Sequence, residues 1–227
     1  MDLIRTLPSK TNKAICEYFN ISDEELKKRI DENPLVALKD WNELGIDKYY
    51  EQTLAHIFGL AGYNGIERML NAIFPILFFC DLTILDYGAG IGSIPMLLAE
   101  DNKVYYYDLP SKTQDFARYL LESNKKKVKF LTKEELTNQK YHVVFFIDVL
   151  EHVKNPMKYV KEIYDMIKPG GLFITTGMSF SVNPDTPMHL AENLEYRKEY
   201  VDFLKENFKL MYYFQGRKET IFAYIKK

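Results

Sequence analysis

The most constraining feature of this sequence is an apolar segment that runs into closely spaced glycines, residues 84–93. Gly88, Gly90 and Gly92 stand at every second position, and glycine accepts the positive φ angles of a tight turn. The segment predicts a buried strand, a turn, and a helix over residues 93–100. The N-terminus of such a helix directs free N–H groups at the turn, so the turn can hold a polar ligand.

The glycine spacing limits the kind of ligand. It is Gly-x-Gly-x-Gly rather than the Gly-x-Gly-x-x-Gly of dinucleotide enzymes, and no Gly-Lys-Ser/Thr follows, which excludes a P-loop. Asp86 precedes the first glycine, and Asp108 follows the next predicted strand, residues 103–107. A carboxylate about 20 residues beyond such a turn binds ribose hydroxyls in open α/β sheets. Two acidic side chains are therefore expected to flank one crevice.

Strands and helices are predicted to alternate from residue 82 onwards, which indicates a parallel sheet covered on both faces. Strands are expected at 82–86, 103–107, 127–131, 142–148 and 171–176, and helices at 93–100, 111–123 and 156–168. A helix over 192–207 should precede two strands, 209–214 and 220–225, whose short connection makes them antiparallel. Ligands of such sheets bind at the carboxyl ends of the strands.

Two further motifs complete the pattern: Asp-Val-Leu-Glu-His from Asp148 to His152, and Lys-Pro-Gly-Gly ending at Gly171. Together with the glycine turn and Asp108, they make residues 80–227 resemble the class I S-adenosylmethionine-dependent methyltransferases. The resemblance implies an α/β fold with a Rossmann-like seven-stranded sheet of order 3-2-1-4-5-7-6, whose last strand is antiparallel.

The resemblance also implies S-adenosylmethionine as the cofactor. Asp86, Gly88 and Gly90 would hold its amino acid part, and Asp108 would bind the ribose. For Asp86 the alternative is a carboxylate that only stabilises the turn.

Two other side chains are expected at the cofactor. Leu109 is placed to touch the adenine, or is an ordinary buried leucine, and Asp148 ends the fourth strand at the same edge. Many relatives bind the adenine amino group with an acid after the third strand. Here Thr132 and Glu134 are the candidates, and the register leaves the choice open.

His152 and His189 are the candidate bases that would deprotonate the methyl acceptor, because imidazole takes a proton near neutral pH. His189 lies in a segment rich in proline, serine and asparagine, residues 179–190, after the fifth strand. The alternative is an exposed histidine without a role.

Asp148, Glu151 and His152 also suggest a metal alternative. The ubiquinone-pathway catechol O-methyltransferases and the small-RNA 3′-terminal methyltransferases look similar here, with a Glu-x-x-Glu-His sequence that binds a divalent metal. This chain has the shorter aspartate first, and many relatives with Val-Leu-Glu-His bind no metal. We therefore expect no metal, and keep as the alternative a metal-assisted O-methyltransferase with His189 as a fourth ligand.

Residues 1–80 are predicted to be a helical cap that binds the substrate, and residues 81–227 the domain that binds S-adenosylmethionine. Ser22 starts a capping box, Asn33 before Pro34 predicts a second helix start, and Gly45 a stop. Helices are expected over 47–60 and 64–79. Aromatic and polar side chains of this part either line an acceptor pocket or form its core: Tyr49, Tyr50, His56, Tyr63 and Asn64.

Composition excludes several classes of protein. The 227 residues include 30 basic and 32 acidic ones, which makes a nucleic-acid partner unlikely. Cys16 and Cys80 are too isolated for a zinc site or disulfide framework, which fits the cytoplasm. The longest apolar run, residues 72–80, is shorter than the roughly 20 residues of a membrane span, so no membrane partner is expected.

The leading interpretation is a methyltransferase that acts on an oxygen or nitrogen atom of a small-molecule acceptor, aromatic or amphiphilic, beneath the helical cap. The alternatives are a protein or RNA methyltransferase, a non-catalytic protein that binds S-adenosylmethionine, and a nicotinamide-dependent oxidoreductase, which the glycine spacing disfavours. The sequence does not indicate the oligomeric state.

Overall fold

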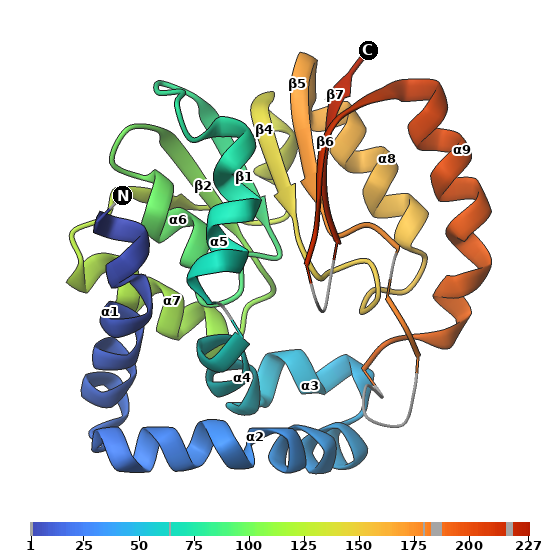
Figure 1. Ribbon diagram of the computed structural model, residues 1–227. Coiled ribbons are helices and arrows are strands. Elements are labelled where there is room, and N and C mark those ends of the chain that lie inside the picture. Colours follow the sequence, from blue (N-terminus) through green and yellow to red (C-terminus); the bar gives the residue numbers. More distant parts are fainter. Residues whose placement is uncertain (1, 64, 179, 183–187, 217–219) are drawn as a thin grey trace. The chain divides into compact units, whose positions relative to one another are not determined.

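The computed structural model describes residues 2–63, 65–178, 180–182, 188–216 and 220–227 (Figure 1). Within these ranges the chain forms a seven-stranded sheet of order β3-β2-β1-β4-β5-β7-β6. Its strands are β1 (Thr83–Tyr87), β2 (Lys103–Tyr107), β3 (Val128–Phe130), β4 (Tyr141–Phe146), β5 (Ile167–Thr175), β6 (Phe208–Gln215) and β7 (Thr220–Lys226).

The strand directions confirm the expected sheet. β1 runs parallel to β2 and β4, and β4 runs parallel to β5. β7 is antiparallel to both of its neighbours, β5 and β6. The central strands are apolar over most of their length, as expected for strands buried on both faces. The predicted α/β fold class and strand order are therefore confirmed.

The chain forms two compact units. One contains Met1–Leu70, Ala89–Glu100 and Asp108–Val128, and the other contains Asn71–Gly88, Asp101–Tyr107 and Lys129–Lys227. We call them the helical unit and the sheet unit. The division into a substrate-binding cap, residues 1–80, and a cofactor-binding domain, residues 81–227, is functional and stays a prediction.

The helical unit packs the N-terminal helices on two helices of the α/β alternation. α1 contacts α6 and α7, and α4 contacts α2 and α7. Ile15, Phe58 and Phe116 are among the side chains that fill its core. Its helices are α1 (Asp2–Phe19), α2 (Asp23–Leu44), α3 (Ile46–Gln52), α4 (Ala55–Tyr63), α6 (Ser93–Leu98), α7 (Lys112–Ser123) and most of α5 (Ile66–Ile73).

Some helix limits in this unit are as expected, and one predicted start is wrong. The Ser22 hydroxyl accepts a hydrogen bond from the Glu25 amide (3.2 Å), and Gly45 ends α2 at φ 68°. No helix begins at Pro34, because α2 continues through it. An internal proline removes one helical hydrogen bond, and we attribute its tolerance here to the packing of α2 on α4.

The helix expected over residues 47–60 is also wrong, because the chain breaks between α3 and α4. Thr53 adopts an extended conformation (φ −68°, ψ 142°). Its hydroxyl donates to the Asp40 carboxylate (2.6 Å) and accepts from the Ala55 amide (3.0 Å). A threonine side chain that competes for backbone groups in this way ends one helix and starts the next. The helix expected over 64–79 likewise ends at Ile73, before Pro75.

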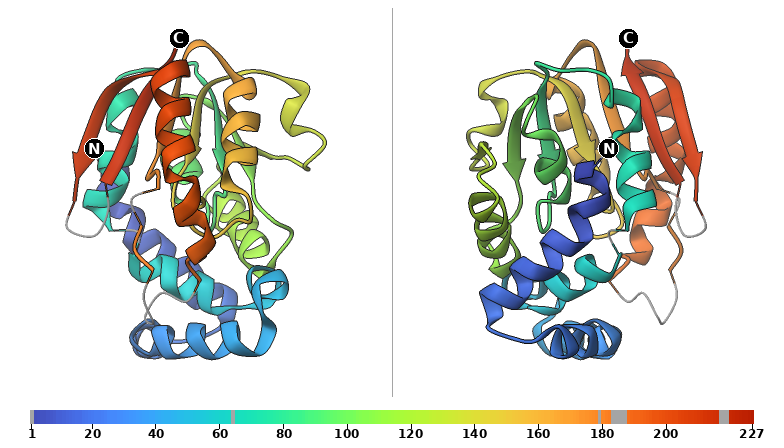
Figure 2. Two further views of the ribbon diagram at one scale, coloured as in Figure 1. Left: turned by 90° about the vertical axis from the view of Figure 1, so that its right-hand side faces the viewer. Right: turned by 60° about the vertical axis from the view of Figure 1, so that its left-hand side comes forward.

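The sheet unit places two helices side by side near β5 and β6 (Figures 1 and 2). They are α8 (Pro156–Met166) and α9 (Arg197–Asn207), and a 3₁₀ turn, η3 (Ala191–Tyr196), leads into α9. Phe146, Phe173 and Ile163 are fully buried in the core of this unit. The carboxyl ends of β1, β4 and β5 meet at one edge, which is where the sequence predicts the site. No described helix is both long and apolar enough to cross a bilayer.

Candidate functional site

The turn after β1 has the backbone that the glycines predict. Gly88, Gly90 and Gly92 adopt φ angles of 75°, 53° and 82°, which side chains disfavour. The Gly88 amide donates to the Tyr107 carbonyl (2.8 Å) and so ties the ends of β1 and β2 together. A Cβ on Gly88 would lie 2.5 Å from Cγ2 of Val149. Glycine is therefore required here both by conformation and by space.

Asp86 precedes the glycine turn in the sequence and Asp108 follows the next strand. The two carboxylates differ in burial and in hydrogen bonding. Asp86 is buried within β1 at 4% exposure. Asp108 follows β2, and its two oxygens accept hydrogen bonds from the Gly90 amide (2.6 Å) and the Leu109 amide (2.7 Å). Burial raises the pKa of Asp108 to about 6, while the two amide bonds act in the opposite direction. The carboxylate is charged at neutral pH, fixed in position, and retains lone pairs for hydroxyl donors.

The Asp108 arrangement fits a ribose, because two fixed carboxylate oxygens can accept bonds from two neighbouring hydroxyls. Leu109 is 52% exposed, so the interpretation as an ordinary buried leucine is wrong. Its contact with adenine stays a prediction.

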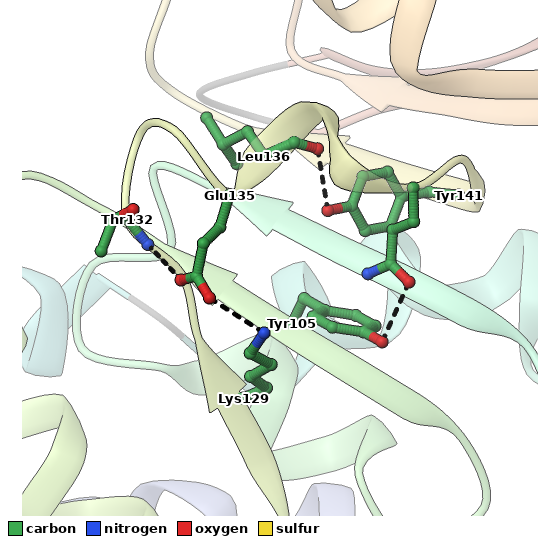
Figure 3. Close-up of polar contacts among 7 residues, drawn as sticks. Tyr105, Lys129, Thr132, Glu135, Leu136 and Tyr141 are labelled. Atoms are coloured by element: carbon green, nitrogen blue, oxygen red, sulfur yellow. Dashed lines mark hydrogen bonds and ion pairs between the residues drawn. The ribbon is translucent and has the colours of Figure 1, made fainter.

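The segment after β3 is held by its own polar side chains (Figure 3). The Glu135 carboxylate accepts from the Thr132 amide (2.9 Å) and pairs with Lys129 (3.0 Å). The pKa of Glu134 is lowered by its backbone amide and the Thr132 hydroxyl. The Tyr141 hydroxyl donates to the Leu136 carbonyl (3.1 Å). Thr132 and Glu134 thus interact with one another, and an adenine contact by either stays a prediction.

The turn after β4 is strained and anchored. Asp148 has a positive φ of 52°, and its amide donates to the Thr176 hydroxyl just beyond β5 (2.9 Å). The next turn places Glu151 at 5% exposure and His152 half-buried. β4 and β5 therefore fix this turn jointly, and Asp148 lies at the sheet edge, as the sequence predicts.

The structure brings His189 to the same place. One potential ligand atom from each of Glu151, His152 and His189 lies within 4.8 Å of the others. The two imidazole rings are 5.2 Å apart between centroids. The two candidate bases, distant in sequence, thus form one cluster with a carboxylate. The sequence-based metal alternative named Asp148, Glu151 and His152 with His189 as a fourth ligand. Of these four residues, the cluster contains the last three and does not include Asp148.

Hydrogen bonds orient both rings and select the tautomer of their neutral forms. Nδ1 of His152 lies 3.0 Å from the Met188 carbonyl, and Nδ1 of His189 lies 2.6 Å from the Ser181 carbonyl. A carbonyl only accepts, so both Nδ1 atoms carry hydrogen, and in the neutral form of each ring the lone pair is on Nε2. Burial lowers the pKa of His152, although the Met188 bond and the Asp148 charge oppose it. Neutral rings of this tautomer can accept a proton or bind a metal ion.

Sequence reasoning missed the residues that support this cluster. Asn193 is fully buried, and its amide group donates to the Leu150 carbonyl (2.8 Å) and the Val153 carbonyl (2.9 Å). The Leu190 amide donates to the Glu151 carbonyl (2.8 Å). These bonds tie the β4 turn to the segment before α9. No local motif marks Asn193, because its partners lie about 40 residues away in the chain.

The aromatic residues predicted at an acceptor pocket pack together within the helical unit. The ring of Tyr50 lies 5.0 Å from that of Tyr49 and 5.6 Å from that of His56, between centroids. Tyr49 is 3% exposed, and burial raises its pKa to about 12. The core interpretation therefore holds for Tyr49, and an acceptor role for this group stays a prediction. Asn64 lies outside the described residues.

Comparison with known proteins identifies the family. A model of the methyltransferase domain matches residues 49–218, which is most of the chain. The chain belongs to the class I S-adenosylmethionine-dependent methyltransferases and is an enzyme of that family.

Two curated relatives are the ubiquinone biosynthesis O-methyltransferases of Rickettsia akari and Rickettsia typhi. They are 39% identical over 98 residues and 36% identical over 97 residues. Each match covers 41% of this chain and 39% of the relative. The chain thus matches well under half the length of these relatives.

Solved structures agree on the fold. The PH0226 protein of Pyrococcus horikoshii has a TM-score of 0.54 at 19% identity, over 73% of this chain and 92% of that one. The N-methyltransferase NodS of Bradyrhizobium japonicum, solved with S-adenosyl-L-homocysteine, has a TM-score of 0.54 at 14% identity, over 70% and 86% of the two chains. Similarity at this level establishes the fold alone.

Proposed function

We propose that this chain transfers the methyl group of S-adenosylmethionine to an oxygen or nitrogen atom of a small-molecule acceptor. The proposed cofactor-binding residues are Asp86, Gly88, Gly90, Asp108, Leu109 and Asp148. The bound cofactor supplies a methyl group activated by a sulfonium. Asp108, fixed by two backbone amides, supports this assignment because it is preorganised to accept bonds from ribose hydroxyls.

The observation that carries the acceptor chemistry is the pair of imidazoles, His152 and His189, that lie in one cluster. Their Nδ1 atoms face backbone carbonyls, so Nε2 is the proton acceptor of each ring in its neutral form, and the rings lie 5.2 Å apart between centroids. One of the two histidines would take the proton from the acceptor hydroxyl or amine. The oxygen or nitrogen atom of the acceptor would attack the methyl group with its lone pair. Alignment of the reacting atoms would supply most of the remaining rate enhancement. The names of the curated relatives favour an oxygen acceptor.

A second candidate is metal-assisted O-methyl transfer. Glu151, His152 and His189 offer two imidazole nitrogens and one carboxylate oxygen within 4.8 Å, a donor set that suits a divalent first-row metal. Backbone carbonyls orient both imidazoles through Nδ1, as commonly happens for metal-binding histidines. A divalent ion there would supply Lewis acidity toward an acceptor oxygen.

The balanced charge, 30 basic against 32 acidic residues, supports a small-molecule acceptor over a nucleic acid. A protein acceptor remains the alternative, and enclosure of the acceptor by residues 1–80 is part of the proposal.

The proposal is tested by incubating the protein with methyl-labelled S-adenosylmethionine and a cell extract separated into small-molecule, protein and RNA fractions. Label in the small-molecule fraction is the expected result. Label in protein or RNA would contradict the acceptor class and keep the chemistry, whereas no label in any fraction would contradict catalysis. A parallel series with chelator separates the two candidates: loss of transfer that magnesium or zinc restores supports the metal, and unchanged transfer excludes it.

A further inference from the structure

The sheet unit contains a cavity of about 590 Å³ that no part of the proposed cofactor site uses. It lies along α9 and strands β6 and β7, and its walls include Met178, Leu204, Phe208 and Phe222. Figure 2 shows α9 beside these strands. Val201 at its wall is 43% exposed, so the cavity is accessible from solvent. Its volume and apolar walls are typical of small-molecule sites.

One polar group of the wall stands out. Tyr200 is 4% exposed, and its hydroxyl makes no hydrogen bond of normal geometry with the described residues. The side chain of Thr175 lies close enough to act on the pKa of this hydroxyl, and it lowers that pKa against the larger effect of burial. A Cβ on Gly177 would lie 3.2 Å from this hydroxyl, so glycine leaves space beside it. A buried hydroxyl without a full hydrogen bond is destabilising, and a ligand atom that bonds to it would remove that cost. Burial also raises the pKa of Tyr200, so it remains a neutral donor.

One part of the cavity wall is close in the chain to the candidate site. Gly177 and Met178 directly follow Thr176, whose hydroxyl accepts from the Asp148 amide (2.9 Å). Arg197, at the start of α9, donates from Nε to the Met178 carbonyl (2.9 Å) and also bonds the Phe180 carbonyl. These hydrogen bonds therefore fix the segment that lines the cavity, residues 177–178, to both the β4 turn and α9.

The charges on the wall restrict the occupant. The described lining residues include two cationic side chains, Arg197 and Lys205, and no carboxylate. A cationic ligand would meet like charge, whereas a neutral or anionic one would not.

We propose that this cavity binds the apolar body of the methyl acceptor, with the Tyr200 hydroxyl bonded to an oxygen atom of it. The occupant is a neutral or anionic molecule with an aromatic or aliphatic body. Its role as the acceptor rests on the proposed function, whereas the binding site itself rests on the cavity and Tyr200.

The probes are 4-butylphenol and butylbenzene, which share an apolar body and differ by one hydroxyl. Methyl-¹³C-methionine labelling reports binding through the Met178 resonance, and Met166, buried in the same unit and outside the cavity lining, is the internal control. We expect both probes to shift Met178 and leave Met166 in place. An unmoved Met178 with both probes would overturn the proposal.

Tyr200→Phe isolates the hydroxyl and keeps the ring. We expect it to weaken 4-butylphenol binding about tenfold, and to leave butylbenzene binding unchanged. Tyr212→Phe, a β6 tyrosine outside the cavity lining, should change neither. Equal 4-butylphenol affinity in wild type and Tyr200→Phe would contradict the role of Tyr200. 4-Butylbenzylammonium should bind more weakly than either probe.

Titration of S-adenosylhomocysteine into the same samples separates the two proposals. If S-adenosylhomocysteine binds but neither apolar probe shifts Met178, the cavity proposal is refuted and the proposed function stays intact. A Met178 response without S-adenosylhomocysteine binding would refute the proposed function, and with it the assignment of the occupant as acceptor. In the transfer assay, butylbenzene should reduce label in the small-molecule fraction, and no reduction at saturating butylbenzene would refute that assignment.

Discussion

The glycine turn and the histidine cluster are both formed at strand ends, but the chain builds them in opposite ways. The turn is local: Gly88, Gly90 and Gly92 lie within five residues, and their positive φ angles follow from the residue type. The cluster of Glu151, His152 and His189 exists only because two segments nearly 40 residues apart are tied together by backbone bonds. The conformation of the first region therefore depends on neighbouring residues, whereas the second region depends on tertiary contacts.

This difference implies that cofactor affinity and transfer rate respond to separate substitutions. Changes at the turn should alter binding of S-adenosylhomocysteine, whereas changes at the cluster should alter the rate and leave that binding intact.

The largest expected effect is that of Asp108→Ala. It removes the carboxylate that we assign to the ribose, so binding of S-adenosylhomocysteine should fall by about 10³-fold. Isothermal titration calorimetry measures the affinity, and circular dichroism checks that the variant folds. Asp115→Ala, at an exposed position of α7, is the matched control and should bind normally. Normal binding by Asp108→Ala would show that the ribose contact is wrongly assigned.

His189→Gln should lower kcat about 10²-fold or more, because it removes a proton acceptor or a metal ligand. The affinity for S-adenosylhomocysteine should stay within about twofold of wild type. His142→Gln, a histidine at the amino end of β4, is the control for loss of an imidazole elsewhere. A wild-type kcat in His189→Gln would remove His189 from the chemistry.

Gly88→Ala tests the turn by stability as well as by binding. An alanine at this position would have a disfavoured positive φ, and its methyl group would clash with Val149. The free energy of unfolding should therefore fall by about 2–4 kcal/mol. Gly170→Ala is the matched control, because Gly170 has φ 72° but no heavy atom within 4 Å of a Cβ. It should cost only about 1 kcal/mol. Urea unfolding compares the two, and equal losses would mean that Val149 does not restrict the turn. Gly88→Ala with Val149→Ala should relieve the contact.

The smallest effect concerns pH. Burial raises the pKa of Asp108 to about 6 from the usual 3.8, so this carboxyl becomes protonated as pH falls through that value. Affinity for S-adenosylhomocysteine should then fall by about tenfold between pH 7 and pH 5. The stability of the unliganded protein depends on pH in the opposite direction, because the folded protein binds this proton more tightly than the unfolded chain. The contribution of Asp108 to the free energy of unfolding is present at low pH and is lost as pH rises through about 6. Asp108→Asn should remove both dependences, and an unchanged pH profile in that variant would exclude Asp108 as their cause.

The sequence predicted what local chemistry determines. The glycine turn, the capping box at Ser22 and the stop at Gly45 followed from residue types and their spacing. The strand order followed from the resemblance to the methyltransferase family. The predicted helix start at Pro34 was wrong because packing between helices overrides a local preference. The break at Thr53 depends on Asp40, a partner that is neither adjacent nor at helical spacing.

The remaining parts of the site depend on tertiary contacts. The sequence suggested His152 and His189 as bases. They lie in one cluster because Asn193 and Leu190 make hydrogen bonds that join their two segments. Tyr200 carried no sequence signal, because its importance depends on the cavity beside it.

The most direct test of the account is a titration of S-adenosylhomocysteine into protein labelled with ¹⁵N-glycine, followed by NMR. If Gly88 and Gly90 hold the cofactor, large shifts are expected for their amides. The resonances of Gly45, which ends α2, and of Gly170, which lies within β5, should stay unchanged. Saturable binding that moves other glycines and leaves Gly88 and Gly90 in place, or no binding to the folded protein, would contradict the central claim.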